Sequence, residues 1–208
     1  YFLLAPNRDL TLTPHVYSDV APLMEAGYRH LTSNGAYQFS AFGTVGKRLS
    51  TTDSSLPGIQ DFRGYFEGSG RFQLDRRWSV TTAMRVVTDR TFLRRYDISR
   101  DDRLRTVINV ERMSRSSYLS IAGWAFQTLR AGETQGQFPV ALPAIDWRKR
   151  LADPWAGGQF EFQLNSLSLI RAEGQDTQRA FAGARWDLRR ITSMGQEVKL
   201  TAYGRADV

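Results

Sequence analysis

Cysteine is absent from this sequence of 208 residues, so the chain forms no disulfide and offers no thiolate ligand for a metal. Lysine is scarce, because Lys47, Lys149 and Lys199 are the only lysines among 28 basic residues. No apolar run approaches the roughly 18 to 20 residues that a membrane-spanning helix needs. These absences exclude a disulfide scaffold and a helical membrane protein. They do not exclude a protein that crosses the membrane with β-strands, since a tilted strand spans the bilayer with about 9 to 11 residues.

The motifs of common enzyme classes are also missing. The chain has no G-x-S-x-G elbow, no Walker loop and no carboxylate pair spaced for general acid and base work. Its two histidines, His15 and His30, fall inside expected strands, where we interpret them as solvated or interfacial rather than catalytic or metal-binding. Asp101 and Asp102 are interpreted as part of a solvated loop. We therefore predict a protein that is not an enzyme, with no catalytic residue, no metal site and no cofactor.

The charge is strongly basic and is carried almost entirely by arginine. The formal net charge is +7 and the pI is about 10.0. Arginine forms bidentate contacts with carboxylate or phosphate. Two interpretations stay open at this point: the arginines pair with Asp and Glu on a polar surface, or they meet an anionic ligand such as nucleic acid or a phosphorylated glycolipid.

A two-residue alternation of apolar and polar side chains is the main signal in the chain. In residues 159–170, Phe162 falls on an apolar face and Gln163 on a polar face, and this alternation extends along the segment. Residues 183–189 and 197–205 alternate in the same way. Each such segment is predicted to be a strand with one apolar and one polar side. Many of them in series are typical of an outer-membrane β-barrel, which meets lipid on one face and a watery lumen on the other.

Eleven strands are predicted, and the expected fold class is all-β: a transmembrane antiparallel β-barrel. The expected strands are 8–16, 23–31, 36–46, 63–74, 78–88, 104–112, 117–127, 141–150, 158–170, 179–190 and 197–206.

The joins between the expected strands alternate between short and long. The short joins are rich in turn-forming residues. They lie around Ser33-Asn34-Gly35, Asp75-Arg76-Arg77, Met113-Ser114-Arg115 and Ser193-Met194-Gly195. The intervening joins, such as 47–62 and 89–103, are longer and charged. A soluble sandwich has no reason to alternate loop lengths, whereas outer-membrane barrels have short periplasmic turns and long extracellular loops. We expect the 47–62 loop outside the cell if the chain enters from the periplasm.

The barrel is expected to be incomplete within this sequence. An odd number of strands would leave unpaired edges, which a bilayer does not tolerate. The chain also opens at Tyr1 without an initiator Met or a signal peptide. We therefore expect residues 1–208 to be one partial barrel domain, the N-terminal part of a larger barrel, with further sequence before Tyr1 and after Val208.

Several segments resemble, in order, the barrel of the LptD family, the lipopolysaccharide-assembly proteins of the Gram-negative outer membrane. The first two are Ala5-Pro6-Asn7-Arg8-Asp9-Leu10-Thr11-Leu12-Thr13-Pro14 and Glu25-Ala26-Gly27-Tyr28-Arg29-His30-Leu31. They are followed by Leu74-Asp75-Arg76-Arg77-Trp78 and Asp89-Arg90-Thr91-Phe92-Leu93-Arg94-Arg95-Tyr96. Shorter pieces continue the succession at Phe126-Gln127-Thr128-Leu129-Arg130, Leu142-Pro143, Gly157-Gly158 and Arg171-Ala172-Glu173-Gly174.

The resemblance implies a function and partners. It implies translocation of lipopolysaccharide and its insertion into the outer leaflet, through a barrel with a lateral seam. It also implies an LptE-type plug lipoprotein in the lumen, an LptA-type periplasmic bridge, and a jelly-roll domain that this sequence does not contain. The family's cysteines have no counterpart in this span, so disulfide control of assembly is not expected from these residues.

The resemblance also implies that a lateral seam lies where the first strand of the family's barrel pairs with the last. Proline cannot donate a ladder hydrogen bond, and prolines in the family's first strand weaken its pairing with the last strand. Pro14 matches one such position, and Leu12 and Thr13 lie beside it; these three residues are the lateral-gate candidates. The alternative is that Pro14 only protects or ends a strand.

The polar sides of the strands supply the expected lumen-facing residues, which could guide sugar and phosphate groups, touch the plug, or form ordinary ion pairs. They are Glu25, Arg29, Glu67, Arg71, Gln73, Arg85, Arg105, Asp146, Arg148, Glu161, Gln163, Arg185 and Asp187.

Three rival functions stay open from the residues alone. A passive porin-like channel shares the fold but needs no weak seam and no attached lipid-binding domain. An outer-membrane hydrolase with its site at the barrel rim needs a nucleophile and a base that the sequence does not bring together. A soluble nucleic-acid-binding β-protein is suggested only by charge, and we predict no nucleic acid among the partners.

Overall fold

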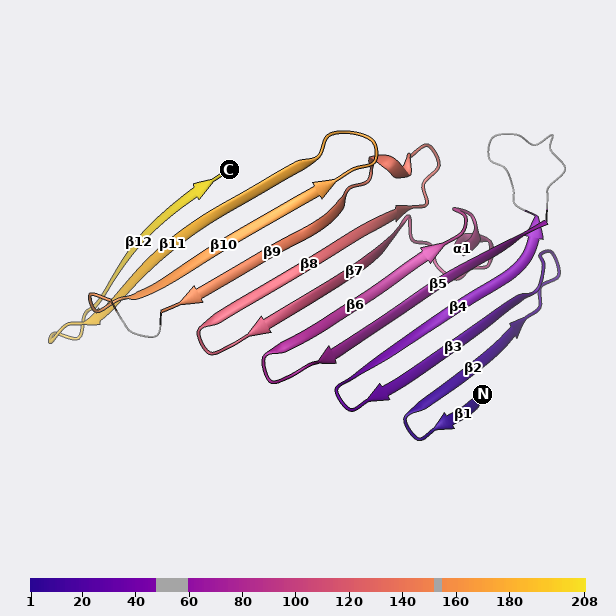
Figure 1. Cartoon of the computed structure of the whole chain (residues 1–208), viewed down its shortest axis with the longest axis horizontal. Coiled ribbons are helices and arrows are strands. Elements are labelled where there is room, and N and C mark those ends of the chain that lie inside the picture. The colour runs from indigo at the N-terminus through magenta and orange to yellow at the C-terminus, as the bar shows by residue number, and fades with distance from the viewer. Residues whose placement is uncertain (48–59, 152–154) are drawn as a thin grey trace.

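The chain forms one antiparallel sheet of twelve strands in a computed structural model that describes residues 1–47, 60–151 and 155–208 (Figure 1). The strands follow one another across the sheet in sequence order, each paired with its neighbours along the chain. No helix among the described residues is long and apolar enough to cross a membrane. The strands are β1 (Phe2–Ala5), β2 (Arg8–His15), β3 (Leu23–Thr32), β4 (Gly35–Lys47), β5 (Gln60–Gln73), β6 (Trp78–Val87), β7 (Arg103–Met113), β8 (Ser117–Thr128), β9 (Val140–Arg150), β10 (Gln159–Ile170), β11 (Thr177–Ile191) and β12 (Glu197–Asp207).

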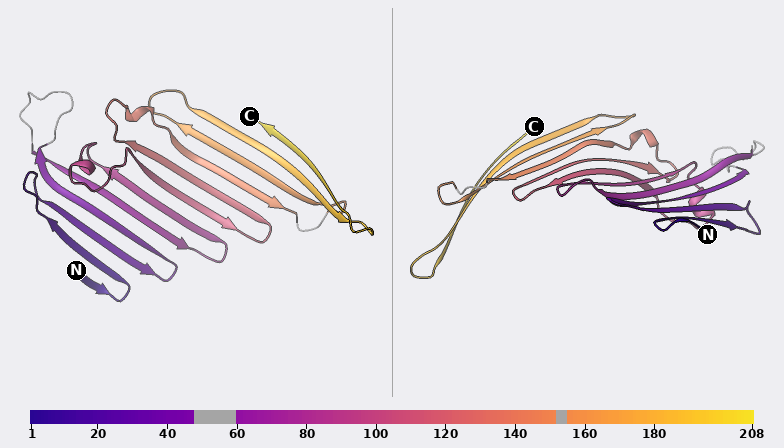
Figure 2. Two further views of the ribbon diagram at one scale, coloured as in Figure 1. Left: turned by 180° about the vertical axis from the view of Figure 1, so that it is seen from behind. Right: turned by 60° about the horizontal axis from the view of Figure 1, so that its bottom comes forward.

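The sheet is a single curved layer. Figure 2 shows its concave and convex sides, with β1 and β12 at opposite ends of the row of strands. Strands β2 to β12 have 8 to 15 residues, enough for most of them to cross a bilayer at a tilt. The described residues thus form a strongly bent wall whose first and last strands do not pair with each other.

The prediction of an all-β antiparallel fold is confirmed, with one strand more than expected. The eleven predicted strands correspond to β2 through β12, and their ends agree to within about three residues. The strand that was missed is β1, which pairs with β2 through Phe2 opposite Leu10 and Leu3 opposite Asp9. Its sequence, Phe2-Leu3-Leu4-Ala5, is a continuous apolar run without the alternation on which the other predictions depended.

The strand register separates the side chains onto two faces. Residues paired across an antiparallel ladder point to the same side of the sheet. Glu67 lies opposite Ser40 and Arg85, on what we call the polar face, whereas its neighbour Phe66 lies opposite Ala41 on the apolar face. Large side chains on the apolar face are 37 to 50% exposed, so no described part of the chain covers them. They include Phe39, Met84, Ile108, Ile121, Phe162 and Leu164.

The two edges of the sheet differ in the length of their connections. Hairpins 33–34, 74–77, 114–116 and 192–196 join strands at what we call the short-turn edge. Segments 16–22, 88–102, 129–139 and 171–176 lie at the opposite loop edge. Residues 48–59, which include most of the expected 47–62 loop, lie outside the described residues, as do 152–154 in the connection from β9 to β10. The alternation of short and long joins therefore holds for most of the described connections.

The only buried apolar cluster in the described chain lies on the polar face at the loop edge. Here the 88–102 segment folds back over the sheet and forms the short helix α1 (Phe92–Arg95). Phe92 and Leu93 are fully buried against strand residues of the polar face that include Tyr65 and Val87. We had predicted only a long charged loop for this segment. The loop instead covers one end of the polar face.

Glycine and phenylalanine occupy the apolar face of β5 from Phe62 to Phe72. A Cβ atom at position 70 would lie 3.1 Å from the Phe72 ring and 3.2 Å from Cβ of Tyr37. Any residue other than glycine at this position would therefore require Phe72 or Tyr37 to shift. On the neighbouring strands Phe39 stacks on Tyr28 with ring centroids 5.0 Å apart. The result is a continuous patch of aromatic rings on the apolar face across β3, β4 and β5.

Candidate functional site

The predicted lumen-facing residues all lie on the polar face of the sheet. The register connects them from strand to strand, for example Glu67 with Arg85, Arg148 with Gln163, and Glu161 with Arg185. They come from β3 (Glu25, Arg29), β5 (Glu67, Arg71, Gln73), β6 (Arg85), β7 (Arg105), β9 (Asp146, Arg148), β10 (Glu161, Gln163) and β11 (Arg185, Asp187).

Most of the charged members of this set form ion pairs along or across the strands. The nitrogen–oxygen distances are 3.1 Å for Arg29 with Asp9, 2.8 Å for Arg148 with Asp146 and 2.6 Å for Arg185 with Asp187. All three arginine side chains are at least half exposed, so each pair contributes little to stability. The polar face is consequently a surface of hydrated, mutually compensated charges, as the simpler interpretation of the arginines predicted.

A hollow of about 690 Å³ lies on this face at the short-turn edge, across β1 to β6. Arg29 and Arg71 line it together with Gln38, and Leu3 and Leu31 add apolar surface. Arg71 forms no ion pair with any carboxylate of the described residues, unlike Arg29. This hollow combines a cation that has no carboxylate partner among the described residues with exposed apolar side chains.

Three other predicted polar-face residues, Gln73, Arg105 and Gln163, do not line this hollow and have separate contacts. Gln73 donates to the carbonyl oxygens of Asp75 at 2.7 Å and Trp78 at 3.1 Å, so it closes the hairpin to β6. The Arg105 guanidinium lies 5.9 Å from the centroid of the Trp124 ring. Gln163 lines a smaller hollow of about 330 Å³ with Tyr203. These side chains share the face but not a common site.

The most buried charged residue, Arg63, was not singled out from the sequence. It lies on the polar face of β5, is 1% exposed, and donates to both carboxylate oxygens of Asp89 at 2.8 and 2.9 Å. It also donates to Thr91 at 3.0 Å, and its guanidinium lies over the Phe92 ring. This bidentate pair fastens the 88–102 loop onto the sheet. Burial alone would raise the pKa of Asp89, but the hydrogen bonds from Arg63 and Thr91 outweigh burial and hold that pKa below its usual value.

Ion pairs also connect the 88–102 loop with the 129–139 loop. Asp102 accepts from Arg94 and from Arg130, and Glu133 accepts from Arg103 at 3.0 Å. A hydrogen bond from Thr128, followed by that of Arg103, lowers the pKa of Glu133 despite some opposing desolvation. The two loops therefore form one connected rim.

The interpretation of Asp101 and Asp102 as a solvated loop pair was incomplete. Both side chains are partly exposed, but Asp101 accepts from Arg85 at 2.7 Å and Asp102 belongs to the rim just described. The hydrogen bond from Arg85, with a second from Ser99, lowers the pKa of Asp101. Sequence spacing gave no signal for these partners, which come from β6, from the 88–102 loop itself and from the 129–139 loop.

The lateral-gate candidates lie on β2, at a part of its outer edge that β1 does not reach. Strand β1 pairs with β2 only as far as Leu10, so Leu12, Thr13 and Pro14 have a partner in β3 alone among the described residues. The Asn7 carbonyl accepts from the Leu31 amide at 2.8 Å, which fixes the hydrogen-bonded pairs of this ladder at odd positions of β2. At the even position 14, the proline nitrogen therefore faces the open edge, where its missing N–H costs no bond to β3.

The two histidines have ordinary hydrogen-bond partners. His15 lies 2.8 Å from the Glu25 carboxylate, and His30, on the apolar face near the short-turn edge, lies 2.9 Å from the Tyr37 hydroxyl. Within the described residues there is no group of three or more His, Cys, Asp and Glu side chains that could hold a metal ion.

Comparison with known proteins identifies the family. The family model described as LptD, LPS transport system D, matches residues 61–208. The LPS-assembly protein LptD of Psychrobacter arcticus is 29% identical over 178 residues, covering 75% of this chain and 18% of that protein. The protein of the same name from Psychrobacter cryohalolentis is also 29% identical over 178 residues, covering 75% of this chain and 16% of that protein. The chain thus spans less than a fifth of the length of these curated relatives. It belongs to the LptD family, a non-enzymatic transport family that assembles lipopolysaccharide at the outer membrane of Gram-negative bacteria.

Proposed function

We propose that this chain forms part of the wall of an outer-membrane barrel that moves lipopolysaccharide to the outer leaflet and releases it through a lateral seam. The observation that carries the proposal is the separation of side chains between the two faces of one curved antiparallel sheet. In an outer-membrane barrel such a sheet places its apolar face against hydrocarbon and its polar face toward a watery lumen.

The backbone supports a position in the bilayer. Each strand from β2 to β11 pairs with a neighbour on both sides, so most of its N–H and C=O groups are satisfied without water. The free edges belong to β1 and β12. We propose that residues 1–208 are one partial barrel domain and that, in the full-length protein, further strands close the barrel between these two edges.

The polar face is proposed to guide the hydrophilic part of the lipid. Lipopolysaccharide carries sugar and phosphate groups that need hydrogen bonds and cations along their path. The hollow lined by Arg29 and Arg71 offers a cation without a carboxylate partner at the short-turn edge, which is the periplasmic edge in barrels of this kind. We propose the polar-face residues as the lumen surface, part of which contacts an LptE-type plug lipoprotein.

The open edge of β2 is the proposed site of lateral release. Leu12, Thr13 and Pro14 lie where β1 leaves β2 unpaired, and the nitrogen of Pro14 faces that edge. A strand that cannot form a full ladder separates from its neighbour more easily than a regular one. Lipid is proposed to arrive from an LptA-type periplasmic bridge through a domain that precedes the barrel.

The proposed facing of the sheet is tested by cysteine labelling at two adjacent positions of β10. Gln163→Cys and Phe162→Cys are introduced separately into the full-length protein in intact outer membranes, with the unmodified protein as the background control. A membrane-impermeant maleimide that enters the lumen should label position 163 strongly and position 162 weakly, because Phe162 faces hydrocarbon. Equal labelling at both positions would refute the assignment of the two faces.

A second measurement separates lipopolysaccharide export from passive conduction. Depletion of the full-length protein should reduce lipopolysaccharide at the cell surface before uptake of small hydrophilic solutes falls. The reverse order would favour a porin-like channel.

A further inference from the structure

The charged side chains described on the apolar face gather at one edge of the sheet, which the proposed function does not require. Among the described side chains of this face, the charged ones are all cations, and each lies within two residues of a strand end at the short-turn edge. They are Arg8, Arg112, Lys149 and Arg190.

These cations lack the carboxylate partners that most polar-face arginines have. The Arg112 guanidinium lies 5.9 Å from the Trp78 ring centroid, and Lys149 donates to the Ser116 hydroxyl at 3.3 Å. Neither forms an ion pair with a carboxylate of the described residues, and no described acidic side chain lies on the apolar face. The nearby Asp75 is occupied in its own hairpin, where it accepts from the amides of Arg77 at 2.6 Å and Trp78 at 2.8 Å. Asp75 also interacts electrostatically with Arg112 without forming an ion pair, so the positive charge at this edge is compensated only in part.

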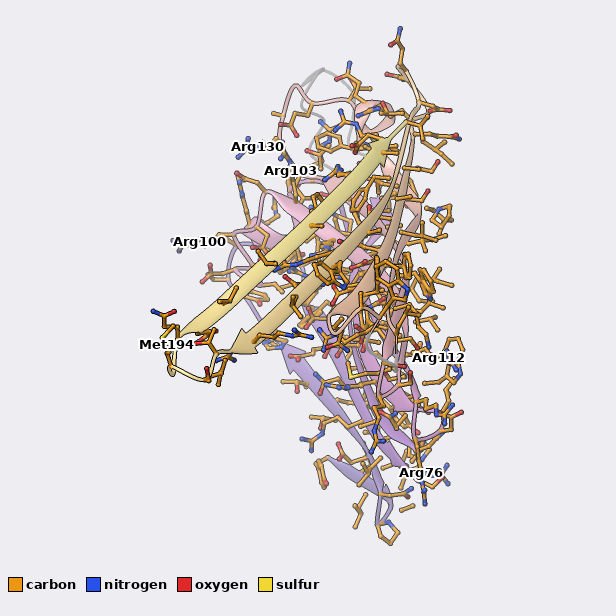
Figure 3. The ribbon with its side chains drawn as sticks, turned by 90° about the vertical axis from the view of Figure 1, so that its left-hand side faces the viewer. Arg76, Arg100, Arg103, Arg112, Arg130 and Met194 are labelled. Atoms are coloured by element: carbon orange, nitrogen blue, oxygen red, sulfur yellow. The ribbon has the colours of Figure 1, made fainter. Side chains whose placement is uncertain are left out.

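Turn residues and aromatic rings add to the same edge. Arg76 and Arg77 lie in the hairpin before β6, and Figure 3 shows Arg76 and Arg112 on one side of the sheet, away from Arg100, Arg103 and Arg130. Trp147 lies in register with Leu119, which is itself opposite Arg112. Aromatic residues with long cationic side chains beside them are typical of the level where hydrocarbon meets lipid headgroups.

We propose that this edge of the apolar face, with Arg112 and Lys149 at its centre, binds the phosphate of an anionic glycerophospholipid such as phosphatidylglycerol. Strands β7 and β9 are separated only by β8, and Lys149 lies two residues beyond Trp147, the residue in register with Arg112. The two side chains therefore start about 12 Å apart and can reach one headgroup region. The inference rests on the proposed membrane orientation. The short turns of such barrels face the periplasm, where the adjoining leaflet consists of phospholipid. Among the described side chains, the loop half of the apolar face has no comparable set of cations.

The test uses the full-length protein with its partner lipoprotein, in nanodiscs of phosphatidylethanolamine and phosphatidylglycerol at a known ratio. Native mass spectrometry counts the phospholipids that stay bound on release. The wild-type protein should retain phosphatidylglycerol above its bulk proportion. Each cation at a membrane surface changes affinity by about fivefold, so the doubly substituted R112Q/K149Q should lose most of this enrichment. The matched control is Arg71→Gln, which removes an arginine at the same edge but on the polar face, and should retain the enrichment.

The charge-conserving variant R112K/K149R should behave as the wild type, and if R112Q/K149Q fails to fold, R8Q/R190Q tests the other two cations of the same edge. Enrichment that is unchanged in both glutamine pairs would overturn the inference. Loss of bound lipopolysaccharide rather than phosphatidylglycerol from R112Q/K149Q, in nanodiscs containing both lipids, would also overturn it. Lipopolysaccharide export by these variants is measured in parallel. Normal export with unchanged phosphatidylglycerol binding would refute this inference alone. Equal maleimide labelling of Gln163→Cys and Phe162→Cys would instead refute the proposed function.

Discussion

Arg63 of β5 and Asp89 of the following loop form a bidentate ion pair that is almost completely removed from solvent. The nitrogen–oxygen distances are 2.8 and 2.9 Å, and the side chains are 2% and 13% exposed. The pair lies beneath the apolar cluster of Phe92, Leu93 and Tyr65, where the 88–102 loop covers the polar face. Because this loop occupies one end of the proposed lumen, the pair helps to keep that end covered.

Replacing Arg63 with alanine should release the loop. The change leaves the Asp89 carboxylate buried without its partner, which typically costs about 3–5 kcal/mol of stability. We expect rapid cleavage of the 88–102 segment by a soluble protease in the full-length protein, while the strands stay protected. Arg29→Ala is the control, since the Arg29 side chain is mostly exposed and its pair with Asp9 contributes little to stability. Equal protease sensitivity of the two variants would contradict the anchoring role of Arg63.

The same pair predicts a dependence of the loop on pH. The pKa of Asp89 is lower in the folded protein than in the unfolded chain, where it is about 3.9. The stabilisation is therefore complete above that unfolded value and is lost as the pH falls through the lower, folded one. Protease cleavage of the loop should be slow at neutral pH and should rise only in strongly acidic buffer. Asp89→Asn removes the titrating group, so its cleavage rate should be raised at neutral pH and should change less on acidification.

Much of the sheet could be predicted because each strand carries its own signal. The alternation that puts Phe162 and Gln163 on opposite faces depends only on neighbouring residues, and it placed every proposed lumen residue on the polar face. Strand β1 was missed because Phe2–Ala5 does not alternate. Between Ala141 and Ala144, β9 has one residue more than its neighbours β8 and β10, which is a β-bulge. This bulge was not predicted, although Pro143 lies in it, since a proline can equally end a strand.

The contacts that hold the loops could not be predicted in the same way. Arg63 has the pattern of any polar strand residue, and its partner Asp89 lies 26 positions further along the chain. A single sequence carries no information about such pairs. The adjacent Phe92 and Leu93 in an otherwise charged loop were the available signal, because two large apolar side chains in a loop need a surface to cover.

Gln127 of β8 replaces part of the ladder between β6 and β7. Those two strands pair only from Trp78 to Ala83, and beyond that point Gln127 accepts from the Val87 amide at 3.0 Å and donates to its carbonyl at 2.8 Å. Gln127→Leu should leave both backbone groups unsatisfied and lower the free energy of unfolding by about 1–3 kcal/mol. Hydrogen exchange should accelerate at residues 84–87, as measured by mass spectrometry on the full-length protein in detergent.

Gln163→Leu is the matched control for that measurement, because the Gln163 side chain makes no hydrogen bond with another described residue. It should leave exchange in β6 unchanged. If Gln127→Leu exchanges at the wild-type rate, β6 and β7 are held together by other contacts, such as packing around the buried Leu104.

Pro14 gives the prediction that bears on lateral release. Its nitrogen faces the part of the β2 edge that β1 leaves free, so Pro14→Ala would add an N–H donor there without disturbing the ladder to β3. An additional hydrogen bond across a seam that must open should slow its opening. We expect cells that depend on the Pro14→Ala protein to show less lipopolysaccharide at the surface at equal protein level. Pro139→Ala, in the loop before β9, removes a proline outside the seam and should export normally. Wild-type export by the Pro14→Ala protein would mean that this edge is either closed throughout transport or held open by something other than the missing donor.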